Sequence, residues 1–127
     1  MTLDEFIAEN KISMTSHPVS TNPYMPDFDG DHWQCLLLCH KRSMSVYFSK
    51  GSGHNGVEPT LPEVLDCLAS DYTEDSFGEW CEEWDYDSDS RKILRTYRTI
   101  MAQSRSLARV LGSVAFNQLV SGEVDRL

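Results

Sequence analysis

Cysteine and histidine are the residues of this chain best suited to metal binding or nucleophilic catalysis, and there are four of each. The side chains that could be pooled into a zinc site are Cys35, Cys39, His40, His54, Cys67 and Cys81. Zinc sites usually present paired cysteines on turns, whereas Cys35 and Cys39 fall in a predicted strand. A strand separates their sulfurs by about 13 Å, which is too far for one metal ion. We therefore predict buried, reduced cysteines and no metal.

A catalytic thiol needs electropositive surroundings that stabilise the thiolate. Cys67 and Cys81 lie instead among acids, which raise the pKa of a thiol. Acids for paired-carboxylate chemistry are plentiful, but no spacing favours one pair over the others. We predict no catalytic residue and a protein that is not an enzyme. A small metal-dependent or thiol enzyme is kept as the third hypothesis.

Two loop motifs have the letters of ligand sites but not their context. Gly51–Gly56 matches G-x-G-x-x-G after a strand, but Val57, Glu58 and Pro59 separate it from the next helix. The dinucleotide fingerprint needs a helix that opens at the loop. Residues 27–31 resemble a calcium loop, but the glycine is fourth where an EF-hand needs it sixth. We predict a glycine-rich loop and a turn, with no cofactor.

The densest charge lies in residues 71–89, which hold nine acids and no base. Aromatic residues interleave with these acids, a mixture typical of protein-binding surfaces, because aromatic anchors dominate interfaces and charges steer the encounter. The opposite hypothesis, equally weighted, turns Phe77, Trp80 and Trp84 into the core, since the two tryptophans share a helix face. The predicted partner-binding residues are Glu74, Asp75, Glu79, Trp80, Glu82, Glu83, Trp84, Asp85, Tyr86 and Asp87.

A basic stripe follows the acids. Residues 90–121 hold six bases and no acid, and five arginines fall within roughly 40° to either side of one line along a helix. This Arg stripe consists of Arg91, Arg95, Arg98, Arg105 and Arg109. Three hypotheses are open for this stripe. It pairs with the acidic run of residues 71–89, which is the favoured hypothesis because the loops between the two are short. Alternatively it contacts nucleic-acid phosphates, or it stays exposed and makes the protein strongly dipolar. Pairing between two copies, giving a homodimer, is also open.

Composition and charge limit the classes of partner and the cellular location that we expect. The net charge of −9 argues against binding nucleic acid or an anionic membrane through the overall field. No apolar run approaches 18 residues, and the acidic start Met1–Glu5 differs from a basic targeting peptide. We therefore expect one domain spanning residues 1–127, in the cytoplasm and without a membrane partner.

Helix signals position the charged segments. Thr60 with Glu63, and Ser76 with Glu79, form capping-box patterns that open helices over 60–70 and 76–84. Asp87 or Ser88 is the predicted cap of a long helix from about residue 89 to 111, followed by Gly112 and a last helix over 113–120. Apolar residues recur along the long helix at intervals of three and four, which predicts a core-facing side.

The N-terminal half is predicted to be a helix over residues 3–9, a long irregular loop over 13–31 and a hairpin. The strands cover 32–40 and 44–49, with a turn at 41–43. Leu36 and Leu38 alternate with Trp33, Cys35 and Leu37, so the first strand is expected to be buried on both faces. The class is α+β, with a short N-terminal helix, an antiparallel β-hairpin and three to four helices, one of them long.

Several segments resemble those of small, mostly uncharacterised bacteriophage and prophage proteins. They include Trp33–Cys35, Val46–Ser49, Glu63–Asp71 and Tyr86–Lys92, and the likeness covers most of the chain. It implies a phage or mobile-element origin and no catalytic residues.

Small acidic phage proteins are often anti-defence factors, such as anti-CRISPR proteins and DNA-mimicking restriction inhibitors. By this analogy we expect a stoichiometric inhibitor that binds a host defence complex, for example a CRISPR effector, in the bacterial cytoplasm. The Arg stripe departs from a pure DNA mimic. The alternative is a nucleic-acid-binding accessory protein that uses the Arg stripe.

Overall fold

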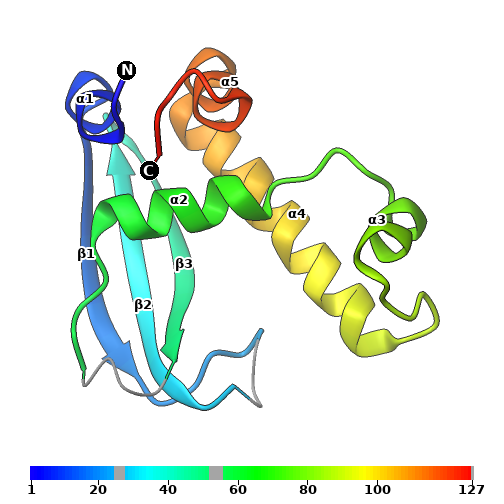
Figure 1. The fold of residues 1–127 in the computed structure, drawn as a ribbon. Coiled ribbons are helices and arrows are strands. Elements are labelled where there is room, and N and C mark those ends of the chain that lie inside the picture. The colour runs from blue at the N-terminus through cyan, green and yellow to red at the C-terminus, as the bar shows by residue number, and fades with distance from the viewer. Residues whose placement is uncertain (25–27, 52–55, 127) are drawn as a thin grey trace.

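The computed structural model describes residues 1–24, 28–51 and 56–126. The order of elements is helix α1, strands β1, β2 and β3, and helices α2 to α5 (Figure 1). Their bounds are α1 Leu3–Glu9, β1 Ile12–Val19, β2 Gly30–Cys39, β3 Arg42–Gly51, α2 Leu61–Asp71, α3 Phe77–Trp84, α4 Arg91–Leu111 and α5 Ser113–Ser121. The predicted α+β class is confirmed, with a short first helix and one long helix.

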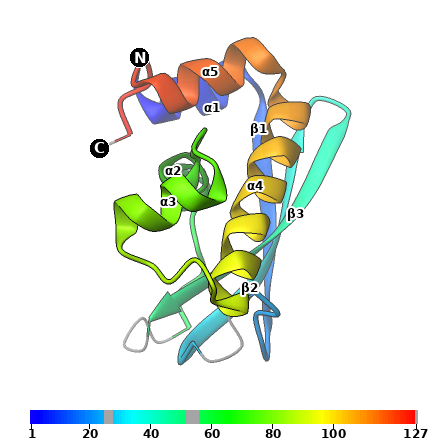
Figure 2. The same ribbon diagram turned by 90° about the vertical axis from the view of Figure 1, so that its right-hand side faces the viewer.

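The sheet is antiparallel in the order β1-β2-β3, with Cys35 of β2 opposite Ser16 and Val46. Helices cover only one of its faces (Figures 1 and 2). Alternate residues of β2 are buried against them, whereas Leu36 and Leu38 are each 39% exposed. The expectation that this strand is buried on both faces was wrong, because a run of leucine and cysteine does not show whether a second layer covers the sheet.

The first strand was missed by the prediction of an irregular loop over residues 13–31. Residues 12–19 pair along their whole length with β2. Their apolar alternation is weak, since the residues that follow Ile12 and Met14 at the same spacing are Ser16, which is half-buried, and Pro18, which is exposed. Pro18 is tolerated because β1 is an edge strand, and the Ser16 hydroxyl donates to the Glu58 carboxylate at 2.7 Å.

The turn of the β2–β3 hairpin lies at His40 and Lys41, one residue earlier than predicted. His40 has φ 56°, and β3 begins at Arg42. Strand β3 therefore extends two residues beyond the predicted 44–49 at each end, whereas β2 starts two residues earlier than predicted and ends one residue earlier, at Cys39.

Helix α2 lies across the covered face of the sheet and is fastened at its start. Thr60 and Glu63 form the predicted capping box. Glu63 also pairs with Lys50 of β3, a lysine only 8% exposed, with Nζ and Oε2 3.0 Å apart. Burial acts to raise the pKa of Glu63, but hydrogen bonds from Lys50 and Thr60 hold it below its ordinary value. Val64, Leu65, Leu68 and Ala69 are buried in the core.

Helix α4 packs against the sheet with its C-terminal half only. Leu107 and Val110 join the core, while the N-terminal half extends past the edge of β3 and carries α3 (Figure 1). Its N-cap is Ser90 rather than the predicted Asp87 or Ser88, because the Asp87 carboxylate accepts the backbone N–H of Asp89 at 2.9 Å and forms a turn before the helix.

Helix α5 closes the other end, with Phe116 and Leu119 buried. The backbone N–H of Asp125 donates to the carbonyl of Met1 at 2.7 Å, so the two ends of the chain lie together beside α1 and α5 (Figure 1). The molecule thus has a packed end, built by the sheet and helices α1, α2 and α5, and a projecting end built by α3 and the start of α4.

Candidate partner-binding site

Four aromatic rings hold helix α3 against α4. We call Phe77, Trp80, Tyr86 and Tyr97 the aromatic cluster. The ring centroids of Trp80 lie 5.0 Å from Tyr86 and 5.4 Å from Tyr97, and Phe77 lies 5.4 Å from Tyr97. The Tyr97 hydroxyl also donates to the carbonyl of Asp75 at 2.6 Å. These contacts from one helix of the main body fix a short helix that does not touch the sheet core.

The two tryptophans of α3 have opposite roles although they are four residues apart. Trp80 is 6% exposed and belongs to the aromatic cluster, whereas Trp84 is 60% exposed. Trp80 was predicted as a partner-binding residue, but the structure places its ring inside the aromatic cluster, where it attaches α3 to α4 and leaves little surface for a partner. The hypothesis that Phe77, Trp80 and Trp84 all turn inward therefore fails at Trp84, and the protein-binding hypothesis stays a prediction.

The other predicted partner-binding residues are exposed, with one exception. Asp75 is half-buried, and the exposed ones are Glu74, Glu79, Glu82, Glu83, Trp84, Asp85, Tyr86 and Asp87. We call residues 74–89 the acidic segment. Asp85 ends α3 in the left-handed conformation, with φ 57°, and so turns the chain back toward α4. The segment therefore presents carboxylates on both sides of Trp84.

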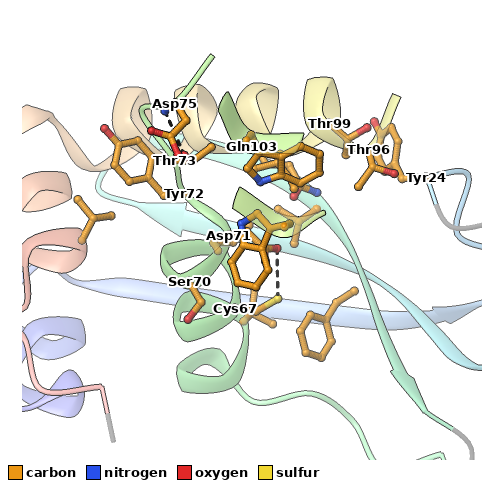
Figure 3. Close-up of a pocket in the computed structure, with 18 of the residues that line it drawn as sticks. Tyr24, Cys67, Ser70, Asp71, Tyr72, Thr73, Asp75, Thr96, Thr99 and Gln103 are labelled. Carbon is orange, nitrogen blue, oxygen red and sulfur yellow. Dashed lines mark hydrogen bonds between the residues drawn. The ribbon is translucent and has the colours of Figure 1, made fainter. Parts of the chain in front are cut away.

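A cleft of about 1160 Å³ lies between α2, α3, the N-terminal half of α4 and the edge of β3 (Figure 3). Trp84 and Tyr86 line it from the acidic segment, and Tyr24 and Tyr47 line it from the sheet side. Its polar lining includes Cys67, Ser70, Asp71, Thr73, Thr96, Thr99 and Gln103. Sequence analysis missed this cleft, because it joins three parts of the chain that are distant in sequence.

Four carboxylates face the cleft, and none of its lining residues within the described ranges is lysine, arginine or histidine. The four are Asp71, Glu74, Asp75 and Glu83. A hydrogen bond with Asp75, followed by desolvation and charge repulsion, raises the pKa of Glu83. Burial raises the pKa of Asp71. The cleft is thus strongly electronegative and has no counter-charge of its own.

The cleft thiol is poorly suited to nucleophilic chemistry. The Sγ of Cys67 donates to Oδ2 of Asp71 at 3.7 Å, and burial together with the Asp71 charge raises the pKa of Cys67 to about 12. Desolvation and Asp87 likewise raise the pKa of Cys81, as its acidic neighbours predicted. All four cysteines are free, and Cys35, Cys39 and Cys81 are buried, but Cys67 is half-buried.

No group of three or more His, Cys, Asp or Glu side chains is arranged for a metal ion in the part of the chain that the structure describes. The Gly51–Gly56 motif falls largely on residues 52–55, which lie outside the described residues, as does Asp27 of the calcium-like segment. Gly30 of that segment begins β2.

The Arg stripe lies on the exposed side of α4, and all five arginines are exposed. Among the residues described, no ion pair within 4.0 Å joins the stripe to the acidic run, so the favoured pairing hypothesis was wrong. The cause is geometric: the aromatic cluster attaches α3 to a side of α4 different from the one that carries the arginines. Arg91, Leu94, Arg95 and Arg98 surround a shallow hollow of about 350 Å³.

Comparison with models of known families, with curated proteins and with solved structures gives no match to this chain. Among the described residues, no helix combines the length and the apolar character needed to cross a bilayer.

Proposed function

We propose that the protein acts by binding, without catalysis, to a basic surface of another protein through the acidic segment. The observation that carries this proposal is the exposed Trp84, surrounded by exposed carboxylates on a helix that a dedicated aromatic cluster holds out from the body. In protein interfaces, exposed tryptophans often contribute much of the binding energy, and charged residues around them speed association with a partner of opposite charge.

The proposed setting is inhibition of a host defence complex by a phage protein, with one inhibitor bound per binding surface. Such complexes carry basic channels for nucleic acid, which a dense group of carboxylates would occupy in competition with phosphates. The resemblance of the sequence to small phage proteins supports this setting, and an anti-CRISPR role is its most specific form.

The test is capture of partners from bacterial host lysate by the tagged protein, repeated with a charge-reversed variant. Glu79→Lys with Glu82→Lys changes two exposed residues of α3 that do not line the cleft. Glu9→Lys with Glu123→Lys is the matched control, because it changes the net charge equally at exposed sites near the chain ends. We expect the wild type and the control to capture a nucleic-acid-binding defence protein, and the α3 variant to lose it by about tenfold or more.

If the α3 variant is folded and captures the same partner as well as the wild type, the acidic segment is not the binding surface. If no nucleic-acid-binding protein is recovered, the proposed setting is wrong.

A second candidate function is nucleic-acid binding through the Arg stripe. It is favoured by the exposure of all five arginines and by the hollow that three of them share with Leu94. Fluorescence anisotropy with labelled duplex DNA and single-stranded RNA tests it. Arg95→Ala with Arg98→Ala should weaken binding uniformly across sequences and reduce the salt slope by about 2. Absence of binding at low salt eliminates this candidate.

A further inference from the structure

The exposed aromatic side chains of this protein are not scattered. Tyr24, Trp84 and Tyr86 are the aromatic residues that are exposed among those described, at 43%, 60% and 44%. All three line the cleft, although Tyr24 comes from the chain between β1 and β2 and the other two from the acidic segment. Exposed aromatic faces gathered in one hollow from distant parts of the chain indicate a surface that another molecule covers.

We propose that the cleft binds an arginine-bearing segment of the partner polypeptide, with a guanidinium group held by Trp84, Asp75 and Glu83. This inference rests on the proposed function and names the chemistry that the partner would present. Aromatic walls and carboxylates together suit a cation, because a ring face attracts positive charge and a carboxylate pairs with it.

Charge complementarity selects the occupant. The Asp75 and Glu83 carboxyls lie beside each other at the cleft, and the neighbouring Asp75 side chain raises the pKa of Glu83. Asp71 and Glu74 add further negative charge at the wall. A bound cation would offset this negative charge, since none of the lining residues in the described ranges is lysine, arginine or histidine.

Arginine fits better than lysine or a free polyamine. Its planar guanidinium stacks on an aromatic ring and donates in a fork to carboxylates, whereas an ammonium is a compact, strongly hydrated charge. The volume of about 1160 Å³ exceeds the roughly 300–1,000 Å³ typical of small-molecule pockets. The cleft therefore has room for several residues of an extended segment.

The experiment uses two peptides that differ only in charge, acetyl-Gly-Arg-Gly-Arg-Gly-amide and the same peptide with citrulline in place of arginine. Binding to the full-length protein is followed by NMR chemical shifts and by tryptophan fluorescence. We expect the arginine peptide to shift resonances of residues 83–86 and of Thr96 and Thr99, and to bind about tenfold or more tightly than the citrulline peptide.

Two variants and a control locate the site. Glu83→Gln and Trp84→Ala should each weaken binding of the arginine peptide several-fold, whereas Glu9→Gln, a change of one exposed carboxylate at the end of α1, should leave the binding unchanged. Trp84 is largely exposed, so its removal should not unfold the chain, and circular dichroism checks this.

Three outcomes would overturn the proposal. Equal affinity for both peptides would show that charge is not recognised. Spermidine binding as tightly as the arginine peptide would identify a small polyamine as the occupant. A dimer in sedimentation that Glu83→Gln and Arg91→Ala each dissociate would identify a second copy of this chain. The lysate capture with the Glu79→Lys and Glu82→Lys variant changes no residue of the cleft. Its result is therefore independent of these three outcomes, and the proposed function can fail or hold separately from the cleft proposal.

Discussion

Helices α2 and α3 begin with the same local signal and end in different environments. Each follows a hydroxyl residue with glutamate three positions later, and in each the hydroxyl accepts the backbone N–H of that glutamate. Helix α2 buries four residues in the sheet core, whereas α3 buries Trp80 and Cys81 away from it. The caps therefore specify where a helix starts, not what it packs against.

The two glutamates show how the surroundings complete the difference. Glu63 closes a reciprocal capping box and pairs with the buried Lys50. Glu79 instead accepts the Ser76 hydroxyl at 2.8 Å, and no ion pair to it is found in the described ranges. Helix α2 is thus held by an ion pair as well as by its buried side chains, whereas the carboxylates of α3 remain accessible to solvent or to a partner.

The largest effect is expected in α2. Leu65→Ala removes a fully buried side chain, so we predict a loss of about 2–5 kcal/mol in the free energy of unfolding, measured by urea denaturation. Leu38→Ala on the open face of the sheet, where the side chain is 39% exposed, is the matched control and should cost about 1 kcal/mol or less. Equal losses would mean that the open face is covered in solution.

Trp80→Ala should act locally, because the aromatic cluster fastens only α3. We predict that amides of α3 exchange with solvent about tenfold or more faster, while those of β2 keep their protection. Hydrogen exchange followed by NMR measures both regions in one sample. A uniform loss of protection would show that α3 is part of the same cooperative unit as the sheet.

The two N-caps offer the closest comparison of the helices. Thr60→Ala should lower the free energy of unfolding by about 1 kcal/mol, since α2 belongs to the core. Ser76→Ala should leave that free energy almost unchanged and speed exchange only within α3. The contrast fails if both substitutions shift the urea midpoint equally.

The smallest expected effect is a pH dependence from Glu83. Its pKa is raised in the folded chain by Asp75, so between the ordinary glutamate value and the raised one the folded state binds more protons than the unfolded state. This contribution to stability is complete below about pH 4.3 and is lost as pH rises through the raised pKa. Asp71 and Glu74 are the other two carboxylates among the lining residues of the cleft.

Glu83→Gln should therefore reduce the decline in thermal stability between pH 4 and pH 7. Glu9→Gln serves as the control, because Glu9 is exposed and lies at the end of α1 rather than at the cleft. Identical pH profiles for Glu83→Gln and the wild type would contradict the carboxyl pair.

Local chemistry was enough to place most helix ends. Thr2, Thr60 and Ser76 each accept a backbone N–H of the first turn, and Gly112 follows α4 with φ 86°. These signals depend on groups within four residues of one another, so sequence spacing captures them. Ser90 was missed because Asp87 and Ser88 offer the same side-chain chemistry two or three residues earlier, and only the observed turn decides among them.

Long-range contacts decided what sequence spacing did not. Strand β1 needs β2 as its partner, since its own alternation stops after two apolar residues. Trp80 and Trp84 lie on one side of a helix in any helical projection, yet Tyr97 covers only Trp80. The cleft likewise combines Tyr24, Cys67 and Thr96, three residues that no motif connects.

The sequence alone therefore determines the α+β class, the helix starts and the separation of acidic from basic residues. Each of these depends on residues that are close together along the chain. The tertiary structure alone decides which face of the sheet is open, which tryptophan is exposed, and that the acids and the Arg stripe do not pair. The last two outcomes depend on how α3 docks onto α4, and the aromatic cluster sets that docking through contacts between residues up to 20 positions apart (Phe77 and Tyr97).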